Sequence, residues 1–259
     1  MAVSFPFLRK RFAAQPASAT RVPDGQRVYA IGDIHGRRDL LEMMIARVEA
    51  DDAARTAAQT TVILLGDLVD RGPDSAGVIT LARDWAARRT VRLLAGNHEE
   101  MFLAAFTDES VLRQFLRFGG RATLLSYPIT AEEYHRTTHA ELQDLMRARV
   151  PDTDIAFLQA MENLIRIGDY VFVHAGIRPG LPLADQAVSD LRWIRGEFID
   201  DSSPRDFAVV HGHTITAAPD LHPWRIGIDT GAFASGVLTA IGLEGCDRWL
   251  LQTTGDAAT

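Results

Sequence analysis

Short apolar segments that end in glycine-bearing polar loops recur through the first part of this chain. Residues 26–31, 61–65 and 90–94 are rich in leucine and β-branched residues. Between them, residues 39–50 and 75–87 carry apolar side chains at the spacing of a helix. This alternation predicts βαβ units and a parallel sheet, with polar residues gathered beyond the carboxyl ends of the strands.

The rest of the chain divides into a helical segment and a second set of strands. Helical patterns dominate residues 100–163, which we expect to form an insertion beside the site. Residues 164–251 contain further strand-like runs separated by glycine turns, and these predict a second, mixed sheet. We expect residues 1–24 to form a flexible tail, so that a single domain spans residues 25–256.

Composition excludes several classes of function. Of the 259 residues, 47% are hydrophobic, and the net charge is −7. This hydrophobic content supports a large core, while the negative charge argues against binding to a nucleic-acid duplex. No segment approaches the ~20 apolar residues of a membrane span. The single cysteine, Cys246, excludes an internal disulfide and fits a reducing cytoplasm.

Five loops carry side chains that can bind metal ions. Asp33 and His35 lie two positions apart at a strand end, so their side chains can point the same way. A carboxylate beside an imidazole suits Mn, Fe, Zn or Co. Five of the eight histidines lie in these loops. The loops are Gly32-Asp33-Ile34-His35-Gly36, Gly66-Asp67-Leu68-Val69-Asp70-Arg71-Gly72, Gly96-Asn97-His98-Glu99, His174-Ala175-Gly176 and His211-Gly212-His213-Thr214.

This set of loops resembles the calcineurin-type metallophosphoesterases, and within them the bacterial relatives of the phosphoprotein phosphatases. The motifs GDxHG, GDxxDRG, GNHE, HAG and GHT are matched in order over residues 32–214. The resemblance implies an α/β fold, a four-layer αββα sandwich of two mixed sheets with a helical insertion. It also implies two divalent metal ions, for which we expect manganese, with Fe, Zn, Co or Ni as alternatives.

The resemblance assigns six residues to the metals. Asp33 and His35 would bind the first ion, and Asp67 would bridge both. The second ion would take its remaining ligands from three further loops, namely Asn97, His174 and His213.

The resemblance also assigns residues to catalysis and to phosphate binding. His98 would donate a proton to the leaving group, and Asp70 would orient it. A high-pKa alkoxide leaving group needs such a proton. Arg71, Arg195 and Arg178 would bind the phosphate oxygens, since arginine can do so bidentately.

Four further positions need an interpretation of their own. The GHT motif selects His213 as the ligand, so we expect His211 to pack or to support the site. Phe118 stands where bacterial members often have the asparagine of an Asn-Gly-Gly segment, which puts a substrate contact by that asparagine in doubt here. Glu99 and Glu100 begin a helix, where acidic side chains interact favourably with the helix dipole.

The expected function is that of a serine/threonine protein phosphatase, a phosphoric monoester hydrolase in which a metal-bridging hydroxide attacks phosphorus directly. Its substrate would be a phosphoprotein or a small phosphoester. The alternative is a symmetrical bis(5'-nucleosyl)-tetraphosphatase, because the same core serves both reactions. The helical segment 100–165 should shape the substrate pocket and so distinguish them. A non-catalytic scaffold is disfavoured, because every expected ligand and the proton donor are present.

Overall fold

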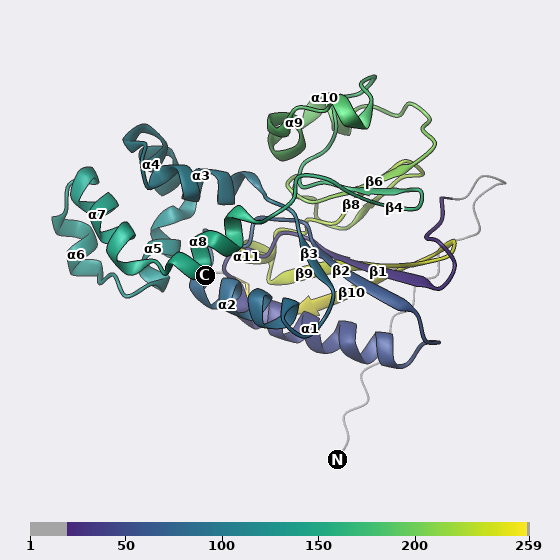
Figure 1. The fold of residues 1–259 in the computed structure, drawn as a ribbon, viewed down its shortest axis with the longest axis horizontal. Coiled ribbons are helices and arrows are strands. Elements are labelled where there is room, and N and C mark those ends of the chain that lie inside the picture. Colours follow the sequence, from purple (N-terminus) through teal and green to yellow (C-terminus); the bar gives the residue numbers. More distant parts are fainter. Residues whose placement is uncertain (1–19, 258–259) are drawn as a thin grey trace, which may run out of the picture.

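Two five-stranded sheets lie face to face in the computed structural model, which describes residues 20–257 (Figure 1). The first sheet is built from β1 (Gln26–Ile31), β2 (Gln59–Leu64), β3 (Val91–Leu93), β9 (Val237–Glu244) and β10 (Asp247–Thr254). Its strand order is β10-β9-β1-β2-β3. Strands β1, β2 and β3 run parallel, as the alternation of strands and helices predicts, and Ala30 pairs with Ile63 across β1 and β2.

The second sheet has the order β4-β5-β6-β8-β7 and is mixed. It is built from β4 (Ile165–Ile167), β5 (Tyr170–Phe172), β6 (Ala208–His211), β7 (Asp220–Leu221) and β8 (Arg225–Gly227). Strands β5, β6 and β8 are parallel, so the loops that follow β5 and β6 emerge at the same edge.

Helices cover both sheets and form a lobe at one side of the molecule (Figure 1). Among residues 20–257, no helix is long and apolar enough to cross a membrane. The helices are α1 (Arg38–Ala53), α2 (Ser75–Ala86), α3 (Asn97–Ala105), α4 (Glu109–Phe115), the π-helical turn η1 (Leu116–Gly120), α5 (Arg121–Ser126), α6 (Ala131–Arg136), α7 (His139–Arg149), α8 (Asp152–Gln159), the 3₁₀ turn η2 (Leu183–Asp185), α9 (Val188–Trp193), α10 (Gly196–Ile199) and α11 (Ala232–Ser235).

Three hydrophobic clusters separate the four layers. Along β1, Tyr29 and Ile31 point to the cluster that also contains buried residues of α1 and α2, whereas Val28 and Ala30 point to the cluster between the sheets. The third cluster packs α9 and α10 on the outer face of the second sheet, where Val209 of β6 contributes. Because successive strand residues face opposite sides, this division confirms the αββα sandwich.

Two features differ from expectation. Strands β9 and β10 do not belong to the second sheet but extend the first, where β9 pairs antiparallel with β1. The chain is also already packed before residue 25. Val22 is fully buried between the sheets, and the Thr20 carbonyl accepts a hydrogen bond from the Tyr170 hydroxyl. Of the expected tail, residues 1–19 lie outside the described part of the chain.

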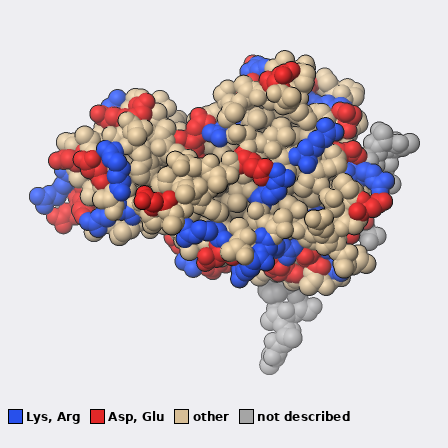
Figure 2. All heavy atoms as spheres, in the orientation of Figure 1, with Lys and Arg blue, Asp and Glu red and all other residues tan. Residues whose placement is uncertain are grey.

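The expected insertion corresponds to helices α3 to α8. Most of them form the lobe at the left of Figure 1, while α9 and α10 form a second prominence. The surface is hollowed between these two prominences, and acidic and basic side chains are interspersed over this face (Figure 2).

Candidate dinuclear metal centre

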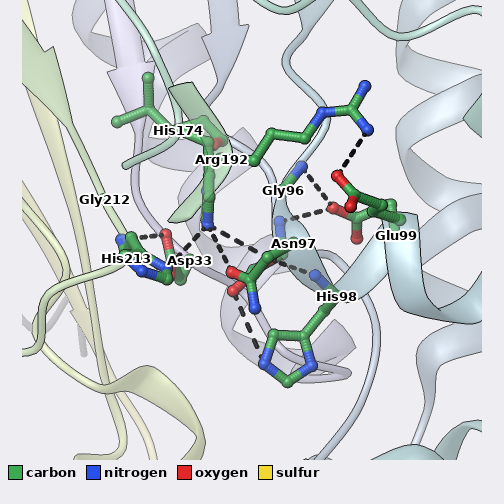
Figure 3. Close-up of polar contacts among 12 residues, drawn as sticks. Asp33, Gly96, Asn97, His98, Glu99, His174, Arg192, Gly212 and His213 are labelled. Atoms are coloured by element: carbon green, nitrogen blue, oxygen red, sulfur yellow. Dashed lines mark hydrogen bonds and ion pairs between the residues drawn. The ribbon is translucent and has the colours of Figure 1, made fainter. Parts of the chain in front are cut away.

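Most of the predicted site residues come together in the loops that follow β1, β2, β3, β5 and β6. In Figure 3, His174 from the loop after β5 points toward Asn97 at the start of α3, with Asp33 and His213 beside it. These side chains are all at least 95% buried, although His213 and Asn97 belong to loops far apart in sequence. The sandwich therefore assembles one polar centre inside an apolar frame.

The loops reach this centre through unusual backbone conformations. In the described part of the chain, five residues other than glycine have positive φ, and all five are predicted site residues: His35, Asp67, Asp70, Arg71 and His213. This region disfavours residues with a Cβ, and such conformations persist where the surroundings enforce them. Their restriction to the predicted site supports a functional reason for the strain.

Asp67 faces two groups of ligand atoms with its two carboxylate oxygens. Its Oδ2 lies 3.5 Å from Nε2 of His35 and 3.9 Å from Nε2 of His98. Its Oδ1 lies 3.4 Å from Nε2 of His174, which in turn is 3.2 Å from Nδ1 of His213. Each group is compact enough to hold a metal ion. Asp67 is shared by both groups, which is the arrangement that a bridging carboxylate requires.

Backbone carbonyls fix the orientation of two of these histidines. Nδ1 of His35 donates to the Val69 carbonyl at 2.7 Å, and Nδ1 of His174 donates to the Leu65 carbonyl at 2.8 Å. A carbonyl can only accept, so Nδ1 carries the proton and, in the neutral ring, Nε2 keeps its lone pair. Metal-binding histidines are commonly held in this way by the nitrogen that does not bind.

The electrostatics of the centre also suit cations. Burial raises the pKa of Asp67 to about 6, and burial together with the neighbouring Asp229 and Asp67 raises the pKa of Asp33. Burial lowers the pKa of His174 to about 4, so its imidazole is neutral at neutral pH. Crowded carboxylates beside neutral imidazoles form a donor set that divalent cations would stabilise. The residues present therefore fit two divalent cations, although the donor group at Oδ2 of Asp67 contains His98 where the resemblance implies Asp33.

Asp33 lies beside this cluster, and the loop after β6 hydrogen-bonds to its carboxylate. Its carboxylate accepts from the backbone N–H of His213 at 3.0 and 3.2 Å. A Cβ on Gly212 would lie 2.0 Å from the Asp33 carboxylate, so a glycine is required for this close approach. Asp229 is also buried and interacts with the Asp33 side chain. Its role was not predicted from the sequence.

His98 and Asp70 form a buried pair at the edge of the centre. Nδ1 of His98 lies 2.6 Å from Oδ2 of Asp70, and its Nε2 accepts from Nη2 of Arg71 at 2.9 Å. Arg71 also donates from Nη1 to Nε2 of His35 at 2.8 Å. Burial raises the pKa of Asp70 to about 8, opposed by the Thr123 hydroxyl and the Arg71 charge. This geometry allows Asp70 to orient the ring of His98, which is the role that the resemblance implies.

The three predicted phosphate arginines differ in their surroundings. Arg195 donates to the backbone carbonyl of His213 at 3.1 Å, which brings it to the centre. Arg178 instead forms ion pairs with Asp190 at 2.7 Å and Glu197 at 2.5 Å. These carboxylates occupy its guanidinium, so the contacts do not support the prediction that Arg178 binds phosphate.

Glu99 has a larger role than the predicted interaction with the helix dipole. Its fully buried carboxylate accepts from the backbone N–H groups of Gly96 at 2.9 Å, Asp67 at 2.8 Å and Leu68 at 2.7 Å. It also accepts from Val69 at 3.3 Å. Glu99 thus ties two of the ligand-bearing loops together. The GNHE motif includes this glutamate, but the backbone N–H groups that it binds are brought to it only by the fold.

His211 and Phe118 have different surroundings. His211 is buried with its ring centroid 5.1 Å from that of Phe198 in an edge-to-face arrangement, and its Nδ1 lies 2.9 Å from the Gly212 carbonyl. This placement agrees with a packing role. Phe118 is 48% exposed, so the side chain that replaces the family's asparagine faces solvent.

Comparison with known proteins agrees with this geometry. The model of the calcineurin-like phosphoesterase family matches residues 26–252, which include all five loops. The chain belongs to the calcineurin-like phosphoesterase family. Members of this family depend on two metal ions, and the two donor groups that share Asp67 are suited to hold them.

Sequence relatives within the family carry the names of dinucleotide hydrolases. The asymmetrical bis(5'-nucleosyl)-tetraphosphatase PrpE of Bacillus velezensis is 27% identical over 236 residues, which cover 81% of this chain and 86% of that protein. The symmetrical bis(5'-nucleosyl)-tetraphosphatase of Delftia acidovorans is 41% identical over 78 residues, which cover 30% of this chain and 25% of that protein. The first of these similarities extends over most of both chains.

Solved structures share the fold. A crystal structure assigned provisionally to a diadenosine tetraphosphatase has a TM-score of 0.64 and 23% identity, covering 93% of this chain and 100% of that one. A cold-active protein-tyrosine phosphatase of a Shewanella species has a TM-score of 0.53 and 17% identity, covering 91% and 85%. At these identities the likeness concerns the fold alone.

Proposed function

We propose that this calcineurin-like phosphoesterase hydrolyses dinucleoside polyphosphates such as diadenosine tetraphosphate. The PrpE relative, similar over 81% of this chain, is named for that reaction. This is the class of reaction that the sequence offered as its alternative. The serine/threonine phosphatase expectation ranks second, because the structural neighbour of that name is 11% identical, with a TM-score of 0.50.

The observation that carries the hydrolytic proposal is the position of Asp67. Its two carboxylate oxygens face separate donor groups, so a single side chain can join two cations. When bound, such a pair of cations lowers the pKa of a water molecule and neutralises charge on the phosphate oxygens, so that water can add to phosphorus as a P–O bond breaks. Asp33 and His35 would hold one cation, with Asn97, His174 and His213 on the other.

The remaining site residues would bind phosphate and move a proton. Arg71 and Arg195 bring permanent positive charge to the centre, where it stabilises the negative charge of the transition state. His98 would give a proton to the departing oxygen, with Asp70 holding its ring. This dyad is the observation that favours the phosphatase candidate, because a serine alkoxide needs a proton more than a departing nucleotide does. Manganese and a cytoplasmic location stay predictions.

One assay separates the two candidates. Metal-loaded enzyme should hydrolyse diadenosine tetraphosphate with a kcat/KM at least tenfold higher than that for a phosphoserine peptide. Separation of the nucleotide products would give the position of cleavage, since two ADP molecules indicate symmetrical cleavage, and ATP with AMP indicates asymmetrical cleavage. The variant Asp67→Asn, purified in the same way, serves as the control for contaminating activity. A preference for the phosphopeptide would reject the proposal in favour of the second candidate.

The arginines allow a matched pair of variants. We expect Arg195→Ala to lower kcat/KM by about 10- to 100-fold, because it removes a charge from the phosphate site. Arg178→Ala removes the same side chain from an ion-paired position and should change kcat/KM less than about twofold. Steady-state kinetics on one substrate checks both. Equal losses in the two variants would show that Arg195 does not act through phosphate.

A further inference from the structure

Asp70, which contacts the proposed proton donor His98, lies on a strained segment of backbone that is held by hydrogen bonds from other segments. Asp70 and Arg71 are consecutive and have φ values of 74° and 70°. Two successive left-handed residues are disfavoured for side chains with a Cβ. Such a turn persists only where neighbouring groups bind its exposed N–H and side-chain atoms.

Those neighbouring groups come largely from the helical lobe. The Asp70 N–H lies 2.8 Å from Oγ1 of Thr123 in α5 and 3.0 Å from Oγ of Ser75 in α2. The Arg71 N–H donates to the Gly119 carbonyl at 3.2 Å. Thr123 and Gly119 therefore accept hydrogen bonds from the two backbone N–H groups of the strained Asp70-Arg71 dipeptide.

The Thr123 hydroxyl makes a second contact, with the Asp70 side chain. Its Oγ1 donates to Oδ1 of Asp70 at 2.6 Å. A hydroxyl has one proton, so Thr123 must accept from Ser75, whose Oγ lies 3.0 Å away. Asp70, Ser75 and Thr123 are all fully buried, so water does not compete for these bonds. The hydroxyls therefore form a directed chain that ends on Oδ1.

With Oδ1 occupied, Oδ2 is the oxygen that meets Nδ1 of His98 at 2.6 Å. We propose that Thr123 is a positioning residue for the reaction: its hydroxyl holds Asp70 in the orientation that fixes His98. This inference rests on the proton-donor role of His98 in the proposed function. It also gives the helical lobe a part in the chemistry, because α5 belongs to the lobe and not to the sandwich.

The test is a pair of variants at Thr123 in the metal-loaded enzyme. Thr123→Val keeps the shape and removes the hydroxyl, and we expect kcat for a phosphoserine peptide, whose alkoxide leaving group needs a proton, to fall about 10- to 100-fold with KM and metal content unchanged. Thr123→Ser keeps the hydroxyl and should restore kcat to within about threefold of wild type. The downfield proton NMR signal of His98 Nδ1–H, assigned by its loss in His98→Asn, should shift in Thr123→Val and return in Thr123→Ser.

Ser126→Ala supplies the structural control. The Ser126 hydroxyl joins α5 to α2 by accepting from the Ala76 N–H and donating to the Thr123 carbonyl, and it does not contact Asp70. This variant should leave both kcat and the His98 signal unchanged. Thermal unfolding of all three variants identifies any general loss of folding.

Several results would overturn the inference. They are an unchanged His98 signal and kcat in Thr123→Val, a failure of Thr123→Ser to restore them, or an equal effect of Ser126→Ala. If the wild type does not cleave diadenosine tetraphosphate, the proposed substrate fails. The NMR comparison still decides the role of Thr123, because it needs no substrate.

Discussion

Replacement of Asp67 by asparagine is expected to lower kcat at least about 10³-fold and to reduce the metal content. Asparagine has nearly the same size, but it lacks the negative charge, and its NH₂ group cannot bind a cation. Since Oδ1 and Oδ2 of Asp67 face different donor groups, one of the two groups must lose its shared ligand. Kinetics and elemental analysis of the purified protein measure both effects.

Thermal unfolding tests the role of Asp67 without a measurement of activity. Burial raises the pKa of Asp67 from 3.8 to about 6, so the folded protein binds this proton more tightly than the unfolded chain. Without metal, the associated stability is lost as the pH rises from about 4 to about 6. At pH 7 the chelated Asp67→Asn protein should therefore be at least as stable as chelated wild type, whereas added Mn²⁺ should raise the Tm of wild type more than that of Asp67→Asn.

Asp51→Asn is the matched control for Asp67→Asn. Asp51 is also a buried aspartate, but it binds the Tyr29 hydroxyl at 2.7 Å and Nε1 of Trp249 at 2.9 Å, away from the centre. Its replacement should lower stability and leave the metal content and the response to Mn²⁺ intact. If Asp67→Asn retained two metals and full activity, the bridging role would be wrong.

Local patterns predicted most of the elements of the fold. The helices expected over residues 39–50 and 75–87 correspond to α1 and α2, and the first three strands form the expected parallel sheet. Patterns of this kind report which faces are buried, and burial determines the element. The position of β9 was missed because an alternating strand does not encode its partner. Its pairing with β1 is a contact between distant segments.

The grouping of the candidate metal ligands could be predicted for a different reason. The types and spacing of Asp33, His35 and Asp67 reflect metal chemistry, which a motif records directly. The residues that support the loops of the centre could not be predicted. Thr123 and Glu99 act through backbone N–H groups and carboxylates of other loops, and those contacts exist only after the chain has folded.

Glu99→Gln should show how much the folded centre depends on such a support. Each carboxylate oxygen of Glu99 accepts from two backbone N–H groups, counting both loops that it joins. Glutamine must place an NH₂ group against one of these pairs of donors. Leaving buried N–H groups unsatisfied in this way should cost about 3 kcal/mol in the free energy of unfolding, measured by urea titration. Metal affinity should fall as well, because Asp67 lies in one of the loops.

The variant Glu100→Gln distinguishes support of the two loops by Glu99 from a favourable interaction of its charge with the helix dipole. Glu100 follows Glu99 in the first turn of α3, but its carboxylate is partly exposed and pairs with Arg192 at 2.9 Å. An interaction with the dipole should affect both variants equally, by less than about 1 kcal/mol. We expect Glu99→Gln to be much more destabilising, because only its carboxylate is fully buried and accepts from two loops. Equal, small losses would mean that Glu99 stabilises its helix and not the metal centre.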